Sequence, residues 1–206
     1  MFENIIKNVH NRHPLIHCIT NYVSINDCAN IVLACGGAPI MAEDINEVSQ
    51  ITSICQGLDI NIGMLNDNKL SSMLKAGATA NELGIPVILD PVGAGSSDYR
   101  IKAVQNLMSN VQFGVIRGNV SEIKAIAAKQ GIHNIAAGVY ETMQKNKSAM
   151  GVEAGIADKI TDDNIKEMAD FINKLSQKTG AVIAVTGGID MVADENRVYA
   201  IRNGHK

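Results

Sequence analysis

The stretch Val87-Ile88-Leu89-Asp90-Pro91-Val92-Gly93-Ala94-Gly95 carries the strongest local indication of the fold. A short aliphatic run ends in a carboxylate, and a loop that contains glycines follows. Such a run is typical of a buried strand, and in open α/β sheets ligands bind at the carboxyl ends of the strands. Asp90 is therefore a candidate to hold hydrated magnesium, which prefers one or two carboxylates together with water and phosphate oxygens. The alternative is a turn aspartate before Pro91 that binds nothing.

Similar apolar runs recur along the chain, and most are separated by segments with helical periodicity. They lie at Leu15–Ile19, Ala38–Met41, Leu58–Ile62, Val87–Leu89, Phe113–Ile116 and Ala181–Val185. This alternation predicts a mostly parallel sheet with helices on its faces, an α/β/α arrangement of three layers. After Val185, the runs Met191–Ala193 and Arg197–Ile201 flank Asp194-Glu195-Asn196 and predict a terminal antiparallel hairpin.

Helix boundaries can also be predicted. Asp44 with Glu47 and Asn119 with Glu122 have the spacing at which an N-cap side chain and an N3 carboxylate satisfy each other's backbone donors. Four glycines lie where helices should stop: Gly36, Gly84, Gly131 and Gly180. The stretch from His133 to Lys159 has the weakest periodicity, and we expect an irregular crossing or a lid-like loop there.

Composition favours one cytoplasmic α/β domain. The chain has 206 residues with 46% hydrophobic content, enough for a single core. Its net charge of −3, without a basic block, argues against nucleic acid and membrane surfaces as partners. The N-terminus has no apolar core of a signal peptide, and the stretch Ile31 to Ala42 is too short to span a bilayer.

The cysteines and histidines give weaker indications. Cysteines 18, 28, 35 and 55 form no Cys-x-x-Cys pair, so we interpret them as small buried hydrophobes and not as a disulfide or zinc framework. His10, His13 and His17 are spaced like a metal-binding helix face, but Pro14 interrupts that helix and disfavours the metal interpretation.

A second strand-to-helix junction lies at Val115-Ile116-Arg117-Gly118-Asn119-Val120-Ser121-Glu122. A guanidinium beside a helix N-terminus favours phosphate. Glu122 has two interpretations, because capping of Asn119 explains it without a metal, whereas its pairing with Asp90 favours a functional role.

Thr186-Gly187-Gly188 follows another strand and offers a hydroxyl and backbone donors that suit a nucleotide phosphate or ribose. Two better-known nucleotide motifs do not occur. The sequence has no Gly-x-x-x-x-Gly-Lys-Ser/Thr, which excludes a P-loop enzyme. Gly93-Ala-Gly95-Ser-Ser-Asp98 lacks the third glycine of a dinucleotide fingerprint, which disfavours a Rossmann dehydrogenase.

Several of these blocks occur in the order seen in hydroxyethylthiazole kinases, which the chain resembles over nearly its whole length. The blocks are His17-x-Ile19-Thr20-Asn21-Tyr22-Val23, Ala38-Pro39-Ile40-Met41-Ala42, Asn61-Ile62-Gly63, Leu89 to Gly95, Arg117-Gly118-Asn119-x-x-Glu122-Ile123 and Val185-Thr186-Gly187. The first two are more particular to thiazole kinases than to ribokinase-like enzymes generally. The resemblance implies a ribokinase-like fold.

The resemblance also implies a reaction and a set of site residues. The reaction is transfer of the ATP γ-phosphate to the primary alcohol of 4-methyl-5-(2-hydroxyethyl)thiazole, a salvage step of thiamine biosynthesis, in a homotrimer with active sites between subunits. Asn21 and Met41 would contact the thiazole. Asp90 and Glu122 would lie by Mg²⁺ and the phosphates, while Arg117 and Thr186 would bind ATP.

One departure from the family pattern concerns catalysis. The family continues after the Asn203-Gly204 region with a Gly-Thr-Gly-Cys-type segment, whose backbone donors form an anion hole and whose cysteine lies beside the reacting alcohol. This sequence ends at Lys206, so we expect a single kinase domain over 1–206 that lacks this segment and its helices, and we assign no catalytic residue. Their loss would expose apolar surface on the sheet. The 133–159 stretch, with Gly151-Val152-Glu153, also departs from the pattern.

Three hypotheses follow. The first is a thiazole kinase of which this sequence is a shortened record. The second is a catalytically impaired homologue that still binds thiazole or nucleotide. The third is a ribokinase-like kinase of another small alcohol or of a nucleotide hydrate, since Asp90, Arg117 and Thr186 are not specific to thiazole.

Overall fold

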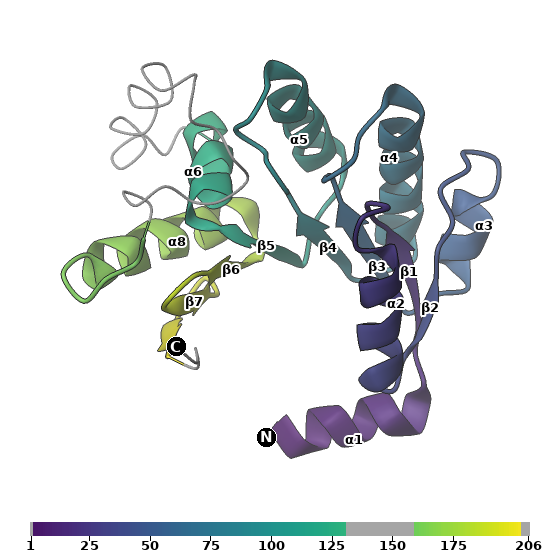
Figure 1. Ribbon diagram of the computed structural model, residues 1–206, viewed down its shortest axis with the longest axis horizontal. Coiled ribbons are helices and arrows are strands. Elements are labelled where there is room, and N and C mark those ends of the chain that lie inside the picture. Colours follow the sequence, from purple (N-terminus) through teal and green to yellow (C-terminus); the bar gives the residue numbers. More distant parts are fainter. Residues whose placement is uncertain (1, 131–158, 203–206) are drawn as a thin grey trace. The chain divides into compact units, whose positions relative to one another are not determined.

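The structure is a computed structural model that describes residues 2–130 and 159–202 (Figure 1). The predictions for Gly131, for the irregular stretch after His133 and for its Gly-Val-Glu motif lie outside the described residues, apart from Lys159. No described helix is both long enough and apolar enough to cross a membrane.

Strands and helices alternate through most of the chain, as the sequence predicts. The strands are β1 (Leu15–Ile19), β2 (Ala38–Ile40), β3 (Gly57–Asn61), β4 (Val87–Asp90), β5 (Val115–Asn119), β6 (Val182–Thr186), β7 (Asp190–Ala193) and β8 (Val198–Ile201). The described helices are α1 (Phe2–Arg12), α2 (Ile25–Ala34), α3 (Val48–Ser53), α4 (Asp67–Glu82), α5 (Asp98–Asn110), α6 (Val120–Lys129) and α8 (Ile165–Thr179). Hydrogen bonding orders the strands β2-β1-β3-β4-β5-β6-β7-β8.

The α/β class with a mostly parallel sheet and a terminal antiparallel hairpin is confirmed. β1 pairs in parallel with β2 and β3, and β5 pairs in parallel with β6. β7 and β8 are antiparallel, and the turn between them is closed by Asp194, whose carboxylate accepts hydrogen bonds from the backbone of Asn196 and Arg197. β5 begins two residues later than predicted, at Val115, and it ends three residues later because its pairing with β6 continues through the polar Arg117-Gly118-Asn119.

The chain divides into two compact units. The first comprises Met1–Leu89 with Leu107–Gln112, and the second comprises Asp90–Asn106 with Phe113–Lys206. A single domain over the whole chain remains a prediction.

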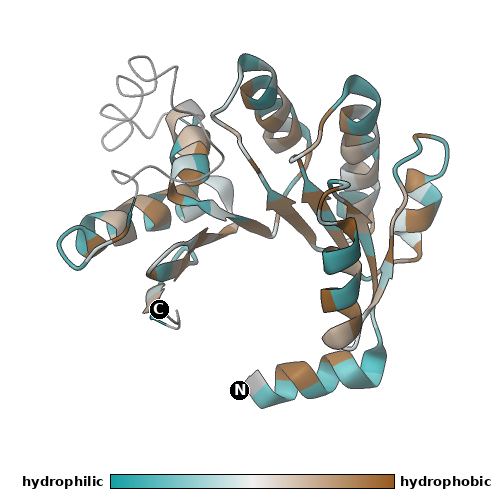
Figure 2. Cartoon of the chain, in the orientation of Figure 1, coloured by the Kyte–Doolittle hydropathy of each residue, from teal (hydrophilic) through white to brown (hydrophobic). Residues whose placement is uncertain are grey.

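The core of the first unit lies between the strands and α4. Leu58 and Ile60 of β3 are buried, as are Met73 and Ala76 at helical spacing on α4. Apolar residues colour most of the strands brown in Figure 2, whereas brown and teal alternate along the helices. Gly77 is needed where α4 approaches Val111, because a Cβ there would lie 2.5 Å from a Val111 methyl carbon.

The core of the second unit is built around β6 and α8. Residues of α8 at spacings of three and four are buried: Met168, Phe171, Ile172 and Leu175. This is the stripe of an amphipathic helix that covers a sheet. The helix ends at Gly180, whose φ of 71° is the left-handed conformation that glycine adopts without strain.

One of the two predicted capping boxes is confirmed and the other is wrong. At the start of α6, Asn119 Oδ1 accepts from the backbone of Glu122, and Glu122 returns a bond to the backbone of Asn119. The Asp44 carboxylate instead accepts from the backbone of Asn46, which forms a tight turn, and α3 begins at Val48 with Glu47 as its N-cap. Gly36 and Gly84, with positive φ, follow α2 and α4 as predicted.

Candidate functional site

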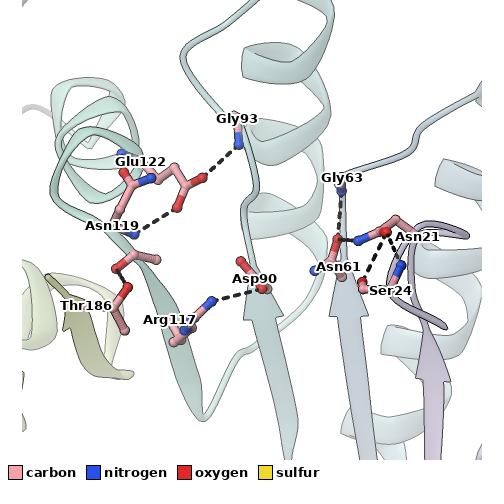
Figure 3. A network of polar contacts seen from close by, with 11 residues as sticks. Asn21, Ser24, Asn61, Gly63, Asp90, Gly93, Arg117, Asn119, Glu122 and Thr186 are labelled. Atoms are coloured by element: carbon pink, nitrogen blue, oxygen red, sulfur yellow. Dashed lines mark hydrogen bonds and ion pairs between the residues drawn. The ribbon is translucent and has the colours of Figure 1, made fainter. Parts of the chain in front are cut away.

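The second unit gathers Arg117, Asp90 and Thr186 at or near the carboxyl ends of strands (Figure 3). Arg117 Nη1 lies 3.3 Å from Asp90 Oδ2. The Arg117 side chain is 51% exposed and that of Asp90 is 18% exposed, so the guanidinium reaches solvent while the carboxylate is mostly covered. The pair presents a cation that an anionic ligand can reach.

Glu122 ties the loop after β4 to the N-terminus of α6. Its Oε1 accepts a hydrogen bond from the backbone of Gly93 at 2.9 Å, and its Oε2 accepts from the backbone of Asn119 at 2.8 Å. The residue is only 7% exposed. The capping interpretation is therefore correct but incomplete, since the same carboxylate also fixes the glycine loop that follows Asp90.

The path of the chain around Glu122 depends on two glycines. Gly93 has a φ of 66°, which an L side chain rarely adopts. A Cβ at Gly118 would lie 3.0 Å from Glu122 Oε2 and 3.2 Å from its Cβ. Gly118 therefore leaves the room in which the carboxylate turns back toward the loop.

Thr186 lies at the end of β6, in register with Asn119 of β5. Its hydroxyl donates to the carbonyl of Gly118 at 3.4 Å, and a hydroxyl oxygen can still accept hydrogen bonds. Gly187 and Gly188 follow it and are exposed, with the Gly187 backbone donating to Asp190. The hydroxyl and part of this backbone can meet a ligand.

The donor set of this unit fits magnesium, a hard cation that prefers oxygen ligands. Asp90 and Glu122 supply carboxylates on either side of the Gly93 loop. Both Glu122 oxygens already accept backbone hydrogen bonds, whereas one Asp90 oxygen faces the half-exposed side chain of Arg117. Asp90 is thus the residue better able to take a metal directly, and Glu122 is better able to act through water.

The residues proposed for the thiazole lie in the first unit, after neighbouring parallel strands β1 and β2. Asn21 Oδ1 accepts from the backbone and the hydroxyl of Ser24 at 3.0 and 3.1 Å, and Asn21 Nδ2 donates to Asn61 Oδ1 at 3.3 Å. The backbone of Gly63 donates to the same Asn61 oxygen at 2.8 Å. Asn21 therefore shapes the turn into α2 and links it to the end of β3 (Figure 3).

Met41 directly follows β2 and is half-buried. The next carbonyl, that of Ala42, is held at 2.8 Å by Nε2 of His17, a fully buried residue of β1. Burial lowers the pKa of His17, although the bond to Ala42 and the charge of Glu47 act in the opposite direction. Nε2 donates to the Ala42 carbonyl, and Nδ1 lies 2.9 Å from the Thr52 hydroxyl, whose single proton is shared between this nitrogen and the Val48 carbonyl 2.7 Å away.

The histidine triplet forms no helix face. His10 lies on α1 and bonds the Ile6 carbonyl, His13 contacts the Gly36 carbonyl, and His17 lies within β1. The interruption at Pro14 is confirmed, and the metal interpretation has no support among these three.

Sequence reasoning missed Lys69, a buried lysine beside the Asn21 turn. It is 4% exposed, donates to the carbonyl of Thr20, lies 2.8 Å from Glu43 Oε2 and sits 4.6 Å from the centre of the Tyr22 ring. The Tyr22 hydroxyl also donates to Glu43. Burial would raise the pKa of Glu43, but the hydrogen bonds from Lys69 and Tyr22 and the Lys69 charge hold it below its usual value.

Lys69 could have been found from the pattern of α4, because it is in helical register with the buried Ser72, Met73 and Ala76. A cavity of about 650 Å³ adjoins it. Neither Asn21 nor Met41 is among its lining residues, which are Glu43, Asp44, Ile45, Asn66, Asp67, Asn68, Lys69 and Ser72.

Comparison with solved structures defines the class as that of ribokinase-like small-molecule kinases. A phosphomethylpyrimidine kinase from Clostridium difficile 630 matches 92% of this chain and 85% of its own with a TM-score of 0.60, and at 13% identity this likeness concerns the fold alone. A hydroxyethylthiazole kinase structure from Pyrococcus horikoshii OT3 matches 98% of this chain and 66% of its own, with a TM-score of 0.79 and 32% identity.

The particular family follows from sequence. The model of the hydroxyethylthiazole kinase family matches residues 6–206. Curated proteins named hydroxyethylthiazole kinase from Clostridium acetobutylicum and Desulfovibrio desulfuricans are 52% and 45% identical over 205 residues. The chain belongs to the hydroxyethylthiazole kinase family. It spans 69% and 66% of the length of these two relatives.

Proposed function

We propose that the protein is an ATP-dependent kinase of the primary alcohol of 4-methyl-5-(2-hydroxyethyl)thiazole, acting in thiamine salvage. Its family membership supports the reaction. The main structural observation behind the proposal is that Arg117 and Asp90 are paired beside the loop that Glu122 holds. Phosphoryl transfer requires mostly positioning and charge stabilisation from the protein, and these residues supply such groups.

The second unit is proposed to bind the nucleotide. A phosphate is a better partner for the half-exposed Arg117 than one carboxylate oxygen at 3.3 Å, because the planar guanidinium can donate two parallel bonds to it. The capped N-terminus of α6 adds backbone dipoles that favour negative charge. The Thr186 hydroxyl would donate to or accept from the nucleotide once it turns from the Gly118 carbonyl.

Asp90 and Glu122 are the proposed magnesium residues. When Arg117 pairs with ATP phosphate, the Asp90 oxygen that it contacted becomes available to a cation. Glu122 meanwhile holds the loop after β4 through its bonds to the backbone of Gly93 and Asn119. The bound cation would neutralise phosphate charge. The Arg117–Asp90 pair thus keeps the two charged groups close to their working positions before the ligands arrive.

The first unit is proposed to bind the thiazole alcohol. Met41 supplies a polarisable thioether that suits an aromatic, sulfur-containing ring. Asn21 is held by Ser24 and Asn61, so its amide is fixed before binding. His17 holds Met41 indirectly through the Ala42 carbonyl.

We also propose a cytoplasmic homotrimer. The four cysteines are free thiols, which is the usual state in a reducing compartment. Large apolar side chains are exposed on α1, on α2 and in the turn between β1 and α2, and such surface favours subunit contact. They are Ile5, Ile6, Tyr22, Val23, Ile31 and Leu33. Sedimentation of the purified chain tests this, with a single species of three chains expected and a stable monomer contradicting it.

The decisive assay follows phosphate transfer from γ-labelled ATP to a panel of small alcohols. We expect labelled thiazole phosphate with Mg²⁺, and much less transfer to simple sugars, pyrimidine alcohols or nucleotide hydrates. Preferential transfer to another alcohol of the panel would contradict the proposal that the thiazole is the substrate. Binding of both ligands by folded protein without any transfer would reject the kinase in favour of a binding homologue.

A further inference from the structure

Three potential metal ligands converge in the first unit. They are Cys18 on β1, Cys28 on α2 and Asp59 on β3, here called the thiol–carboxylate cluster. Their two sulfur atoms and one carboxylate oxygen all lie within 4.8 Å of one another. No other such group of three occurs among the residues that the structure describes.

The fold explains how residues so far apart in sequence meet. Cys18 and Asp59 are direct partners in the parallel pairing of β1 with β3, so their side chains leave the same face of the sheet. Cys28 lies in the first turns of α2, where its backbone bonds the Ser24 carbonyl at 2.9 Å. Strand register and the turn into α2 together build the cluster, and neither can be read from cysteine spacing.

The cluster has the chemistry of a cation site. All three groups are acids, and each carries a negative charge once it has lost its proton. Burial, the Cys28 thiol and the charge of Asp59 raise the pKa of Cys18, and burial with Asp59 raises that of Cys28 despite the opposing hydrogen bond from Cys18. Two thiolates and a carboxylate would together offer three anionic ligands, whose mutual repulsion a divalent cation offsets.

We propose that Cys18, Cys28 and Asp59 bind a zinc-type divalent cation with an open fourth position. Two thiolates favour a borderline-soft metal, and the carboxylate oxygen favours Zn²⁺ over Cu⁺. Zinc–sulfur bonds of about 2.3 Å and zinc–oxygen bonds of about 2.1 Å put tetrahedral ligand atoms roughly 3.6 to 3.8 Å apart. Side-chain rotations that move the ligand atoms by about 1 Å would bring the cluster to that spacing.

Burial supports a site that is covered but reachable. Cys18 is 2% exposed, whereas Cys28 and Asp59 are half-buried, so an ion can enter from their side. Binding converts two thiols to thiolates and releases two protons for each Zn²⁺ bound, with no change of oxidation state. The three ligands are different residues from those proposed to bind ATP or thiazole, so the site needs neither of these ligands.

Cobalt titration of the tag-free, chelator-treated chain tests the proposal, because Co²⁺–thiolate bonds give an ultraviolet charge-transfer band that oxygen and nitrogen ligands do not. We expect saturation at one ion per chain, displacement by Zn²⁺, and at least about tenfold weaker binding in Cys28→Ser and Asp59→Asn. The matched control Cys35→Ser, at an exposed cysteine, should bind as the wild type does. A wild type without the band, or a band unchanged in Cys28→Ser, overturns the proposal.

A second measurement uses only the wild type, so it does not depend on whether the variants fold. Bound Zn²⁺ should protect Cys28 from alkylation at least about tenfold, while the exposed Cys35 reacts at an unchanged rate. Equal alkylation of Cys28 with and without Zn²⁺ would reject the site.

Discussion

Arg117 Nη1 and Asp90 Oδ2 lie 3.3 Å apart, so the cation proposed for ATP and the carboxylate proposed for magnesium are paired with each other. Removal of the Asp90 charge should affect the two ligands differently. Asp90→Asn frees Arg117, so we expect metal-free ATP to bind as well as or better than in the wild type. The gain in affinity on adding Mg²⁺ should fall about tenfold or more, because the charged ligand is lost.

Calorimetric titration of ATP with Mg²⁺ and with a chelator measures this difference. In the wild type, removal of Mg²⁺ should weaken ATP binding clearly. If Asp90→Asn keeps the full Mg²⁺ effect, Asp90 is not a magnesium residue.

Met41→Ala should weaken binding of the thiazole alcohol and leave ATP binding nearly unchanged. The substitution removes a half-buried thioether, and the loss of such apolar contact costs about 1.5–3 kcal/mol, or roughly tenfold in affinity or more. Titration of the variant with each ligand separately makes the comparison. Met64→Ala, at an exposed methionine of the same unit, is the matched control and should behave as the wild type does. Equal losses for both ligands in Met41→Ala would contradict the assignment.

Gly118→Ala should destabilise the second unit. The new Cβ would lie 3.0 Å from Glu122 Oε2, and that buried carboxylate cannot move without losing its bonds to Gly93 and Asn119. Loss of a hydrogen bond to a charged group costs about 1.5–3 kcal/mol, and we expect a decrease of this size in the free energy of unfolding. Gly188→Ala is the control, since nothing lies within 4 Å of its Cβ. Similar urea midpoints for both variants would refute the close-contact argument.

The stability of the chain should fall as the pH decreases below about 6.5, the ordinary histidine value, partly through His17. Burial lowers the pKa of His17 in the folded protein, so the unfolded chain takes up a proton that the folded chain resists. The stabilisation is present above the unfolded pKa and is lost as the pH falls toward the folded pKa.

Urea denaturation between pH 7.5 and 5.5 tests this, with values chosen to bracket about 6.5. His17→Gln should flatten the pH dependence, whereas His10→Gln, on the exposed surface of α1, should retain it. The same slope in His17→Gln as in the wild type would show that His17 does not contribute.

Local patterns predicted much of this fold because they depend on nearby residues. The run Leu15–Ile19 is β1 with the same bounds, and Asn119 with Glu122 forms the predicted capping box. Asp44 with Glu47 has the same spacing but forms no capping box, because the Asp44 carboxylate accepts a hydrogen bond from the backbone of Asn46 instead. Spacing therefore predicts a capping box only where the helix begins at the expected residue.

Contacts between distant residues could not be predicted in this way. The meeting of Cys18 with Asp59 depends on the register of two strands, and the burial of Lys69 depends on Glu43 and Tyr22 from earlier in the chain. Strand ends did indicate Asp90, because chemistry in α/β sheets concentrates there. Met41 had no local indication of function and was identified only through the family resemblance.

The most direct test of the account is calorimetric titration of magnesium–ATP into wild type, Arg117→Ala and Lys102→Ala. Lys102 is an exposed cation on α5 of the same unit and serves as the control for charge. We predict saturable binding of one nucleotide per chain in wild type and Lys102→Ala, and binding at least about tenfold weaker in Arg117→Ala. Equal ATP affinity in Arg117→Ala and wild type would contradict the nucleotide site.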